Sequence, residues 1–187
     1  TLQDELTGKR IVPTSGGGWS WSELRNINFF LENCYNTLSF QDAAPYAGVA
    51  KFFRAYFYFE KVKRFGDVPW YGKVLDVNDE AELMKGRDPR TLIVDSIMAD
   101  LDFAIKYMSD SKSDEKATKW TAIALKSRVA LFEGTFRKYH PEFNLPNANK
   151  YLELAAEASK QLIDGGQYSL YSGAGAESYG KLFNSVN

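Results

Sequence analysis

The fold of this chain is decided by the stretch Phe52-Phe53-Arg54-Ala55-Tyr56-Phe57-Tyr58-Phe59-Glu60-Lys61-Val62-Lys63-Arg64-Phe65-Gly66-Asp67-Val68-Pro69. Aromatic residues favour strands, but the length of the segment and the cations near its end favour a helix over residues 46–65. Such a helix is apolar around most of its circumference, which predicts that it is buried. Gly66 stands where a helix-ending glycine belongs, and Pro69 prevents the helix from resuming.

Arg54 is the charged residue that interrupts this aromatic run. A guanidinium in a buried helix needs a carboxylate, a carbonyl or an aromatic ring face as a partner, because an unpaired buried charge is very costly. The sequence therefore predicts that Arg54 makes a structural contact and that its removal destabilises the fold.

Four further segments have apolar residues at steps of three and four, which predicts amphipathic helices. Their stripes are Leu24, Ile27, Leu31, Cys34, Tyr35 and Leu38; Val94, Ile97, Leu101, Ala104, Ile105 and Met108; Ala122, Leu125, Val129, Phe132 and Phe136; and Tyr151, Ala155, Ala158 and Leu162.

Local signals predict where these four helices begin and end. The predicted starts are Ser20 or Ser22 as cap of the first helix, Asp88 followed by Pro89 for the second, a position near Thr118 for the third, and Asn147 or Asn149 for the fourth, which Gly165 and Gly166 end. After that, residues 168–171 predict a short strand.

This order of elements predicts an all-α fold of antiparallel helix pairs of the tetratricopeptide kind, an alpha-alpha superhelix with long irregular loops. The repeat is not regular, because Leu24 and Val94 are 70 residues apart, far more than ~34 residues per repeat. The excess lies in residues 67–87. A connection of this length is expected to be functional or to pack against another part of the protein.

We expect three parts along the chain. Residues 1–18 are predicted to be an irregular lead-in, 19–165 the helical region, and 166–187 a short strand or loop leading into a C-terminal region outside this chain. The sequence starts without Met or an apolar signal segment, and it ends without a helix-stop signal. We therefore interpret it as an internal piece of a longer protein.

Composition excludes several classes of function. The 187 residues include 23 Lys or Arg and 24 Asp or Glu, a net charge of −1, which argues against a nucleic-acid binder. One Cys and one His exclude an intrachain disulfide and a Cys/His zinc cluster. Apolar runs stay far below the ~18 residues of a membrane span. No metal or other cofactor is predicted.

Catalytic groups are equally scarce. Cys34 lies on an apolar stripe, where a thiol behaves as a small hydrophobe. His140 precedes Pro141 at a helix end and is interpreted as a helix-end cation. Asp95, Asp100 and Asp102 flank the second stripe and are predicted to form a solvated face. No catalytic residue is assigned.

Aromatic side chains in loops are the remaining candidates for binding. Trp and Tyr combine a large apolar ring with a polar handle, which suits stacking on sugars or peptide side chains. Trp19 and Trp21 follow three consecutive glycines, and Trp70 and Tyr71 lie in the long connection. Arg25 and Asn28 lie close enough in the chain to Trp21 to supply hydrogen bonds. Packing onto the helices is the alternative for each of them.

Five motifs together resemble the SusD/RagB family. They are Trp21-x-x-Leu24-Arg25-Asn26-x-Asn28-x-Phe30-Leu31-Glu32-Asn33; Phe53-Arg54-Ala55 with Arg64-Phe65-Gly66-Asp67-Val68-Pro69; Asp88-x-Arg90 through Asp95, Asp100 and Asp102; Ala124 to Lys138; and Tyr151-x-x-x-Ala155-x-x-Ala158 with Gly165-x-x-Tyr168-x-Leu170. They occur in the order of that family and span roughly residues 19–171.

The resemblance implies a surface lipoprotein anchored to the bacterial outer membrane. It implies non-enzymatic capture of oligosaccharides, and delivery to a SusC-like TonB-dependent transporter that the helical scaffold packs against. Peptides are the alternative ligand. The lipidated cysteine of the family is absent, since Cys34 follows Leu31-Glu32-Asn33 rather than small residues. The chain resembles only the N-terminal helical part of the family.

Two readings compete with nutrient capture. The first is a helical scaffold that binds a protein partner and no small ligand. The second is a glycoside-active enzyme, which needs two carboxylates about 5–9 Å apart facing one cleft. A binding protein needs neither.

The position of Cys34 generates a first prediction. A thiol buried on a helix stripe is inert, because burial disfavours the thiolate that reacts. We expect a thiol reagent to label Cys34 slowly in the native protein and rapidly in urea. Equally fast labelling under both conditions would contradict the assignment.

Overall fold

The computed structural model describes residues 2–9, 11 and 16–184. Five long helices carry the fold: α2 (Ser22–Asn33), α3 (Phe40–Phe65), α5 (Arg90–Tyr107), α6 (Lys119–Tyr139) and α7 (Ala148–Asp164). Three short ones are α1 (Leu2–Leu6), α4 (Glu80–Leu83) and α8 (Ser178–Asn184), and two 3-10 turns cover Pro141–Phe143 and Gly175–Glu177. Within the described ranges, β pairing is limited to one isolated antiparallel bridge between Val68 and Asp88.

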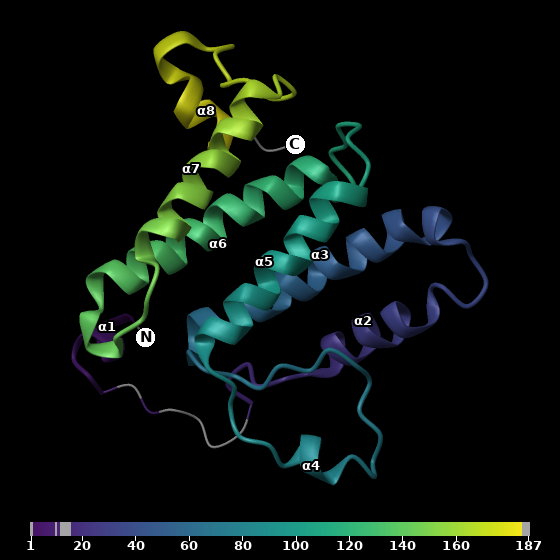
Figure 1. The fold of residues 1–187 in the computed structure, drawn as a ribbon. Helices are drawn as coiled ribbons and strands as arrows, with labels where there is room; N and C mark the ends of the chain where they lie inside the picture. Colours follow the sequence, from purple (N-terminus) through teal and green to yellow (C-terminus); the bar gives the residue numbers. More distant parts are fainter. Residues whose placement is uncertain (1, 10, 12–15, 185–187) are drawn as a thin grey trace.

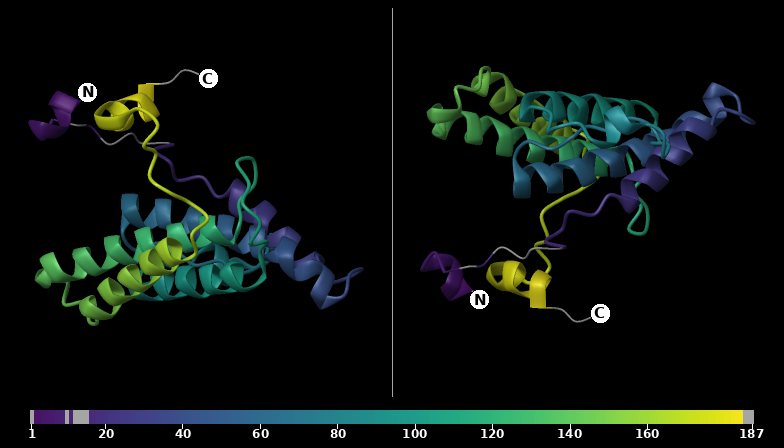
Figure 2. Two further views of the ribbon diagram at one scale, coloured as in Figure 1. Left: turned by 90° about the horizontal axis from the view of Figure 1, so that it is seen from above. Right: turned by 90° about the horizontal axis from the view of Figure 1, so that it is seen from below.

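The long helices form one array in which each helix packs on the next (Figure 1). α2 packs on α3, α3 on α5, α5 on α6 and α6 on α7. Successive helices run antiparallel, so the predicted all-α, tetratricopeptide-like architecture is confirmed. Figure 2 shows that α1 and α8 both lie to one side of this array. None of the helices in the described ranges is both long and apolar enough to span a bilayer.

The core lies between α3, α5 and α6. α5 and α6 contribute their predicted apolar stripes, whereas the predicted burial of α3 holds only in part, since Phe53 and Tyr56 are about half exposed. The fully buried side chains include Tyr58, Ile97, Leu101 and Val129. Close packing of such residues supplies most of the stability, at about 1.5–3 kcal/mol for each large apolar side chain that is buried. The helices are therefore held by packing rather than by intrinsic propensity.

The turn between α2 and α3 differs from the prediction. The stripe of the first helix was extended to Leu38, but α2 ends at Asn33, and both Tyr35 and Leu38 are exposed. α3 begins at Phe40 rather than near 46, with Pro45 inside its second turn. Ser39 caps it, since its hydroxyl accepts the Asp42 N–H at 3.3 Å. A proline inside a helix is usually unfavourable, but this one lies close to the start of α3.

Cys34 lies at the C-terminal cap of α2 rather than within the helix. Its predicted burial is confirmed, since 9% of it is exposed. The Sγ–H donates to the Leu31 carbonyl, and burial raises the pKa of the thiol. The inertness of this thiol stays a prediction.

The helix caps were only partly predicted. Trp21, not Ser20 or Ser22, precedes α2, and it makes no side-chain cap. Pro89 is the cap of α5 rather than its first residue. The backbone N–H of Arg90, which has no partner within the helix, donates to Asp67 Oδ1 at 2.8 Å, at the other end of the long connection. A tertiary contact has replaced the local cap that was predicted.

The starts of α6 and α7 agree with the prediction. Thr118 and Thr121 form a capping box for α6, and Asn147 occupies the N-cap position of α7 without a side-chain hydrogen bond to the helix. Gly165 ends α7.

The ends of the chain are more helical than predicted, and the predicted strand is wrong. Residues 168–171 are a loop, and α8 follows within the segment 166–187. α1 lies within the predicted irregular lead-in, while Thr14 and Ser15 of the glycine-rich loop lie outside the described residues. The division of the chain into three parts stays a prediction.

A buried ion pair joins α3 to α5. Arg54 Nε donates to Asp100 Oδ2 at 2.6 Å, and its Nη2 donates to Oδ1 at 2.9 Å. Lys51 reaches the same carboxylate at 2.8 Å. The predicted structural contact of Arg54 is confirmed. The prediction that Asp100 is solvated is wrong, because it is 3% exposed and turned toward this guanidinium. Asp100 and Asp102 are two residues apart in α5, so their side chains point to different sides of the helix.

Glu133 forms a second buried ionic cluster, between α5 and α6. Arg90 Nη2 and Arg137 Nε each donate to its carboxylate at 2.8 Å. Arg137 also donates to the Pro146 carbonyl at 2.7 Å, which fixes the turn into α7. Asp95 accepts the Tyr151 hydroxyl at 2.7 Å, so it too contacts α7. Ionic and polar contacts thus set the register of neighbouring helices at two levels of the array.

The Arg54–Asp100 pair leads to a stability prediction. Arg54→Ala leaves a buried carboxylate with only Lys51 as its partner. We expect the free energy of unfolding in urea to fall by about 3 kcal/mol, the lower end of the range for a broken buried pair.

Lys126→Ala is the matched control. It removes the pair with Asp102, whose side chain is 60% exposed, and it is expected to cost no more than about 1 kcal/mol. Equal losses for the two variants would contradict the central role of Arg54.

Candidate functional site

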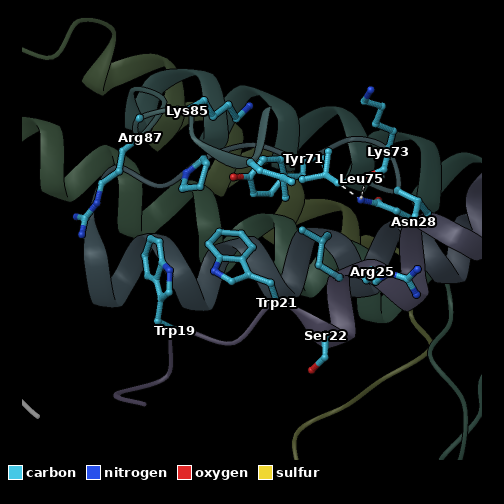
Figure 3. Close-up of a pocket in the computed structure, with 15 residues that line it drawn as sticks. Trp19, Trp21, Ser22, Arg25, Asn28, Tyr71, Lys73, Leu75, Lys85 and Arg87 are labelled. Atoms are coloured by element: carbon cyan, nitrogen blue, oxygen red, sulfur yellow. Dashed lines mark hydrogen bonds between the residues drawn. The ribbon is translucent and has the colours of Figure 1, made fainter. Parts of the chain in front are cut away.

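A cavity of about 680 Å³ opens between the N-terminal half of α2 and the long connection from α3 to α5 (Figure 3). Its floor is aromatic, and its rim carries basic side chains. The connection spans residues 66–89 and contains only the short helix α4. Its backbone polar groups need partners, and side chains of α2 and α3 supply several of them.

Asn28 on α2 holds the connection by its backbone. Its Nδ2 donates to the carbonyls of Tyr71 at 2.9 Å and Lys73 at 3.0 Å. Its Oδ1 accepts Arg54 Nη1 at 3.2 Å, and the same guanidinium nitrogen lies 3.3 Å from the Gly72 carbonyl. Asn28 is 1% exposed. Its amide is thus fully engaged, and its role is to place the loop.

Further side chains fix both ends of the connection. The Tyr71 N–H donates to the buried Tyr58 hydroxyl at 2.7 Å, and the Trp70 N–H donates to Asp88 Oδ2 at 2.7 Å. Glu32 of α2 accepts the Val74 N–H at 2.7 Å. Burial raises the pKa of the Tyr58 phenol well above its usual range, so this hydroxyl stays protonated.

The floor consists of Trp19, Trp21 and Tyr71, which contact one another edge to face. The Trp21 ring lies 5.1 Å from that of Trp19 and 5.5 Å from that of Tyr71. Trp21 also packs on Phe57 and Tyr58 of α3. Trp19 packs on Phe65 at 4.8 Å and keeps 40% of its surface exposed. One indole is therefore part of the core, and the other presents a face to solvent.

The loop that carries Trp19 is held by Lys61. Its Nζ donates to the Gly18 carbonyl and lies 5.5 Å from the centre of the Trp21 ring. Burial lowers the pKa of this ammonium. Gly16, Gly17 and Gly18 all have positive φ, a conformation that glycine adopts without strain. With the glycines in this conformation, Trp19 packs on Phe65 of α3 and does not project freely into solvent.

Four basic side chains line the cavity: Arg25, Lys73, Lys85 and Arg87. Lys85 lies 4.8 Å from the centre of the Tyr71 ring and donates to the Trp70 carbonyl at 2.7 Å. Burial acts to lower the pKa of Lys85, but the carboxylates of Asp88 and Glu82 outweigh it and raise that pKa. Arg87 lies over the Trp19 ring at 5.2 Å.

The structure brings together most of the residues that the sequence analysis selected. Trp19, Trp21, Arg25, Asn28 and Tyr71 line the cavity. Trp70 is not among the residues that line the cavity. Its ring packs on the Tyr58 ring at 4.2 Å, and the Arg54 guanidinium lies over it at 5.2 Å. Lys73, Lys85 and Arg87 were missed. The feature that could have indicated these residues was the unusual length of the connection, to whose basic side chains the sequence analysis assigned no role.

The described part of the chain holds no group of three or more His, Cys, Asp and Glu residues placed to bind a metal ion. No carboxylate lines the cavity, so the pair that glycoside hydrolysis requires is not present there. His140 lies at the far end of α6, half exposed, and contacts Glu142. What the cavity offers is stacking surface and hydrogen-bond donors.

The array of antiparallel helices, with an aromatic cavity between α2 and the long connection, defines a helical-repeat protein of the tetratricopeptide-like class. Within that class, residues 20–131 match the SusD-like family model that is described as "Starch-binding associating with outer membrane". The chain belongs to the SusD-like family.

Individual relatives agree with this assignment. The chain is 31% identical to SusD-like protein P2 of Formosa agariphila over 93 residues, which is 49% of this chain and 18% of that protein. A SusD-like protein from Bacteroides fragilis has a similar fold, with a TM-score of 0.67 at 29% identity over 83% of this chain and 28% of that one. A laminarin-binding SusD-like protein has a TM-score of 0.65 at 20% identity, covering 87% of this chain and 32% of its own. The chain spans less than a third of each relative.

The engagement of Asn28 generates a prediction about the cavity wall. Asn28→Leu keeps the approximate shape of the side chain and removes the amide from three contacts. The Lys73 carbonyl then loses its partner, and the Tyr71 carbonyl keeps only the Tyr58 hydroxyl at 3.5 Å. Each unsatisfied group costs about 1–3 kcal/mol, so the connection should open locally. We expect faster amide hydrogen exchange at residues 70–76, with α6 and α7 unchanged.

Asn26→Leu, at an exposed position of the same helix, should leave exchange in the connection unchanged. Equal protection of residues 70–76 in the wild type and in Asn28→Leu would show that Asn28 does not hold the loop.

Proposed function

We propose that this chain contributes to non-enzymatic capture of oligosaccharides, with the cavity over Trp19, Trp21 and Tyr71 as the contact surface. The observation that carries the proposal is the half-exposed Trp19 beside a cavity of about 680 Å³ that is lined by the basic side chains of Arg25, Lys73, Lys85 and Arg87. A sugar ring presents C–H groups to an indole face and hydroxyls to donors at its edge, and this cavity offers both.

Family membership supports the same function. The family description names starch binding in association with an outer membrane, and one structural relative binds laminarin. The absence of carboxylates from the cavity lining agrees with binding without turnover. Peptide capture by the same type of complex is the alternative, since stacking and guanidinium contacts also suit peptide side chains.

We further propose that the whole protein is located at the outer-membrane surface and delivers its ligand to a SusC-like TonB-dependent transporter. The anchor would be an N-terminal lipid, as the family resemblance implies. Support comes from the membrane association in the family description.

A protein-binding role of the helical array has an observation of its own. Phe53 and Tyr56 of α3 are 47% and 48% exposed, beside a groove of about 650 Å³ between α2 and α3. Exposed aromatic patches mark surfaces that contact other proteins. Such a contact is compatible with ligand capture at the cavity, which includes neither of these residues.

The two indoles are expected to differ when they are replaced. Trp19→Ala removes an exposed ring and should weaken oligosaccharide binding several-fold, because a stacked ring contributes on the order of 1 kcal/mol beyond its buried area. Trp21→Ala removes a ring packed on α3 and should also lower the melting temperature by several degrees, as a core truncation does. Calorimetric titration with the best ligand of a glycan array, together with thermal unfolding, measures both effects.

Tyr46→Ala is the control, since Tyr46 is 64% exposed and lies outside the cavity. Its affinity and melting temperature should equal those of the wild type. Unchanged affinity for both tryptophan variants would remove the cavity from the proposal.

A further inference from the structure

The charge of the cavity differs from that of the chain. The chain as a whole carries a net charge of −1. The cavity lining holds two arginines, two lysines and no Asp or Glu. Neutral sugars need donors but no excess of positive charge, so this asymmetry requires a reason.

The two lysines are already compensated by carboxylates outside the lining. Lys85 Nζ lies 3.2 Å from both Glu82 and Asp88. Lys73 Nζ lies 3.3 Å from Asp79. These ammonium groups contribute to the architecture of the connection and leave little net charge for a ligand.

The two arginines are different. Arg87 donates to the Phe65 carbonyl at 3.3 Å and lies over the Trp19 ring. Arg25 is exposed on α2. Within the described ranges, neither guanidinium is in an ion pair with a carboxylate. Figure 3 shows them at opposite ends of the cavity, with Trp19, Trp21 and Tyr71 between them.

From this arrangement we infer that the ligand is an anionic oligosaccharide, which carries sulfate esters or uronate carboxylates along its chain. The inference rests on the proposed function and specifies its substrate class. Sugar rings would lie over the aromatic floor, and anionic substituents would meet Arg87 at one end and Arg25 at the other. A guanidinium presents a planar fork of donors that matches carboxylate and sulfate oxygens in pairs.

Arg87 is better prepared for this contact than a free surface arginine. Its Phe65 carbonyl contact and the Trp19 ring beneath it limit its rotamers before a ligand arrives. Binding then costs less side-chain entropy than it would for a free arginine. Within the described residues, its guanidinium is in no ion pair with a carboxylate, so donors other than the one bound to Phe65 are available to an anion.

The test compares matched ligands on the complete protein as its organism makes it. The probes are three pairs with the same backbone: sulfated galactan oligosaccharides and their desulfated forms, oligogalacturonates and their methyl esters, and sulfated and native laminari-oligosaccharides. We expect at least one charged member to bind about tenfold more tightly than its neutral partner, as a charge-assisted contact provides. Its affinity should fall as salt rises from about 0.01 M to about 0.15 M, since the Debye length shrinks from about 30 Å to about 8 Å.

Variants separate charge from packing. Arg87→Gln and Arg25→Gln should each weaken binding of the charged ligand roughly tenfold and leave the neutral partner within about twofold. Arg87→Lys keeps the charge and should retain part of the affinity, because an ammonium lacks the paired donors. Arg128→Gln, at an exposed position of α6 outside the cavity, is the matched control and should change neither.

The outcomes distinguish this inference from the function on which it rests. Neutral members that bind as tightly as charged ones, or binding that neither salt nor Arg87→Gln affects, would overturn the anionic ligand and leave oligosaccharide capture intact. A short Glu-rich peptide that binds in place of every oligosaccharide would overturn both. No binding by any member of the panel would also overturn both.

Discussion

The contact between Arg54 and Asp100 is the constraint on which the other parts of this structure depend. It lies where α3 crosses α5, and the guanidinium that makes it also reaches Asn28 on α2 and the Gly72 carbonyl in the long connection. One side chain thus relates three helices and a loop. Packing alone would tolerate small shifts of these helices, but a two-pronged hydrogen-bonded ion pair does not, because a buried charge displaced from its partner is expensive. The position of the cavity wall is therefore set from within the helical core.

This dependence explains how a connection with little secondary structure forms one wall of a site. Residues 66–89 combine internal contacts, such as Asp88 with the Trp70 N–H, with partners from the helices, since Asn28, Glu32 and Tyr58 bind its backbone. A wall held in this way is positioned by the scaffold while its own side chains stay free to vary. Loops on a rigid scaffold commonly carry recognition for this reason. Ligand preference can then change through Lys73, Lys85 or Arg87 without disturbance of the core.

The aromatic floor combines packing and recognition in adjacent residues. Trp21 packs on α3 and also faces the cavity, whereas Trp19 lies over Phe65 and remains half exposed. Trp19 contacts both Trp21 and Phe65, so its ring is held in place although it is half exposed. A ring that is fixed before binding loses less entropy on contact with a ligand. The cation beneath the floor, Lys61, strengthens this arrangement through its contact with the glycine loop.

Helical periodicity and ordered motifs are local properties of the chain, so the five long helices and the resemblance to the family follow from the sequence alone. The predicted burial of the aromatic helix α3 holds only in part, since Phe53 and Tyr56 are about half exposed. The sequence also indicated that Arg54 needs a partner and that Trp19, Trp21 and Tyr71 are candidates for ligand binding. The tertiary structure was needed to identify Asp100 as that partner. It also showed that Asn28 binds the backbone of the long connection and that Trp70 packs on Tyr58, outside the cavity. It alone placed Arg25 and Arg87 at one cavity although they are distant in sequence. Such pairings depend on how helices cross and on where a long loop returns, and no periodicity within a single segment encodes either of them.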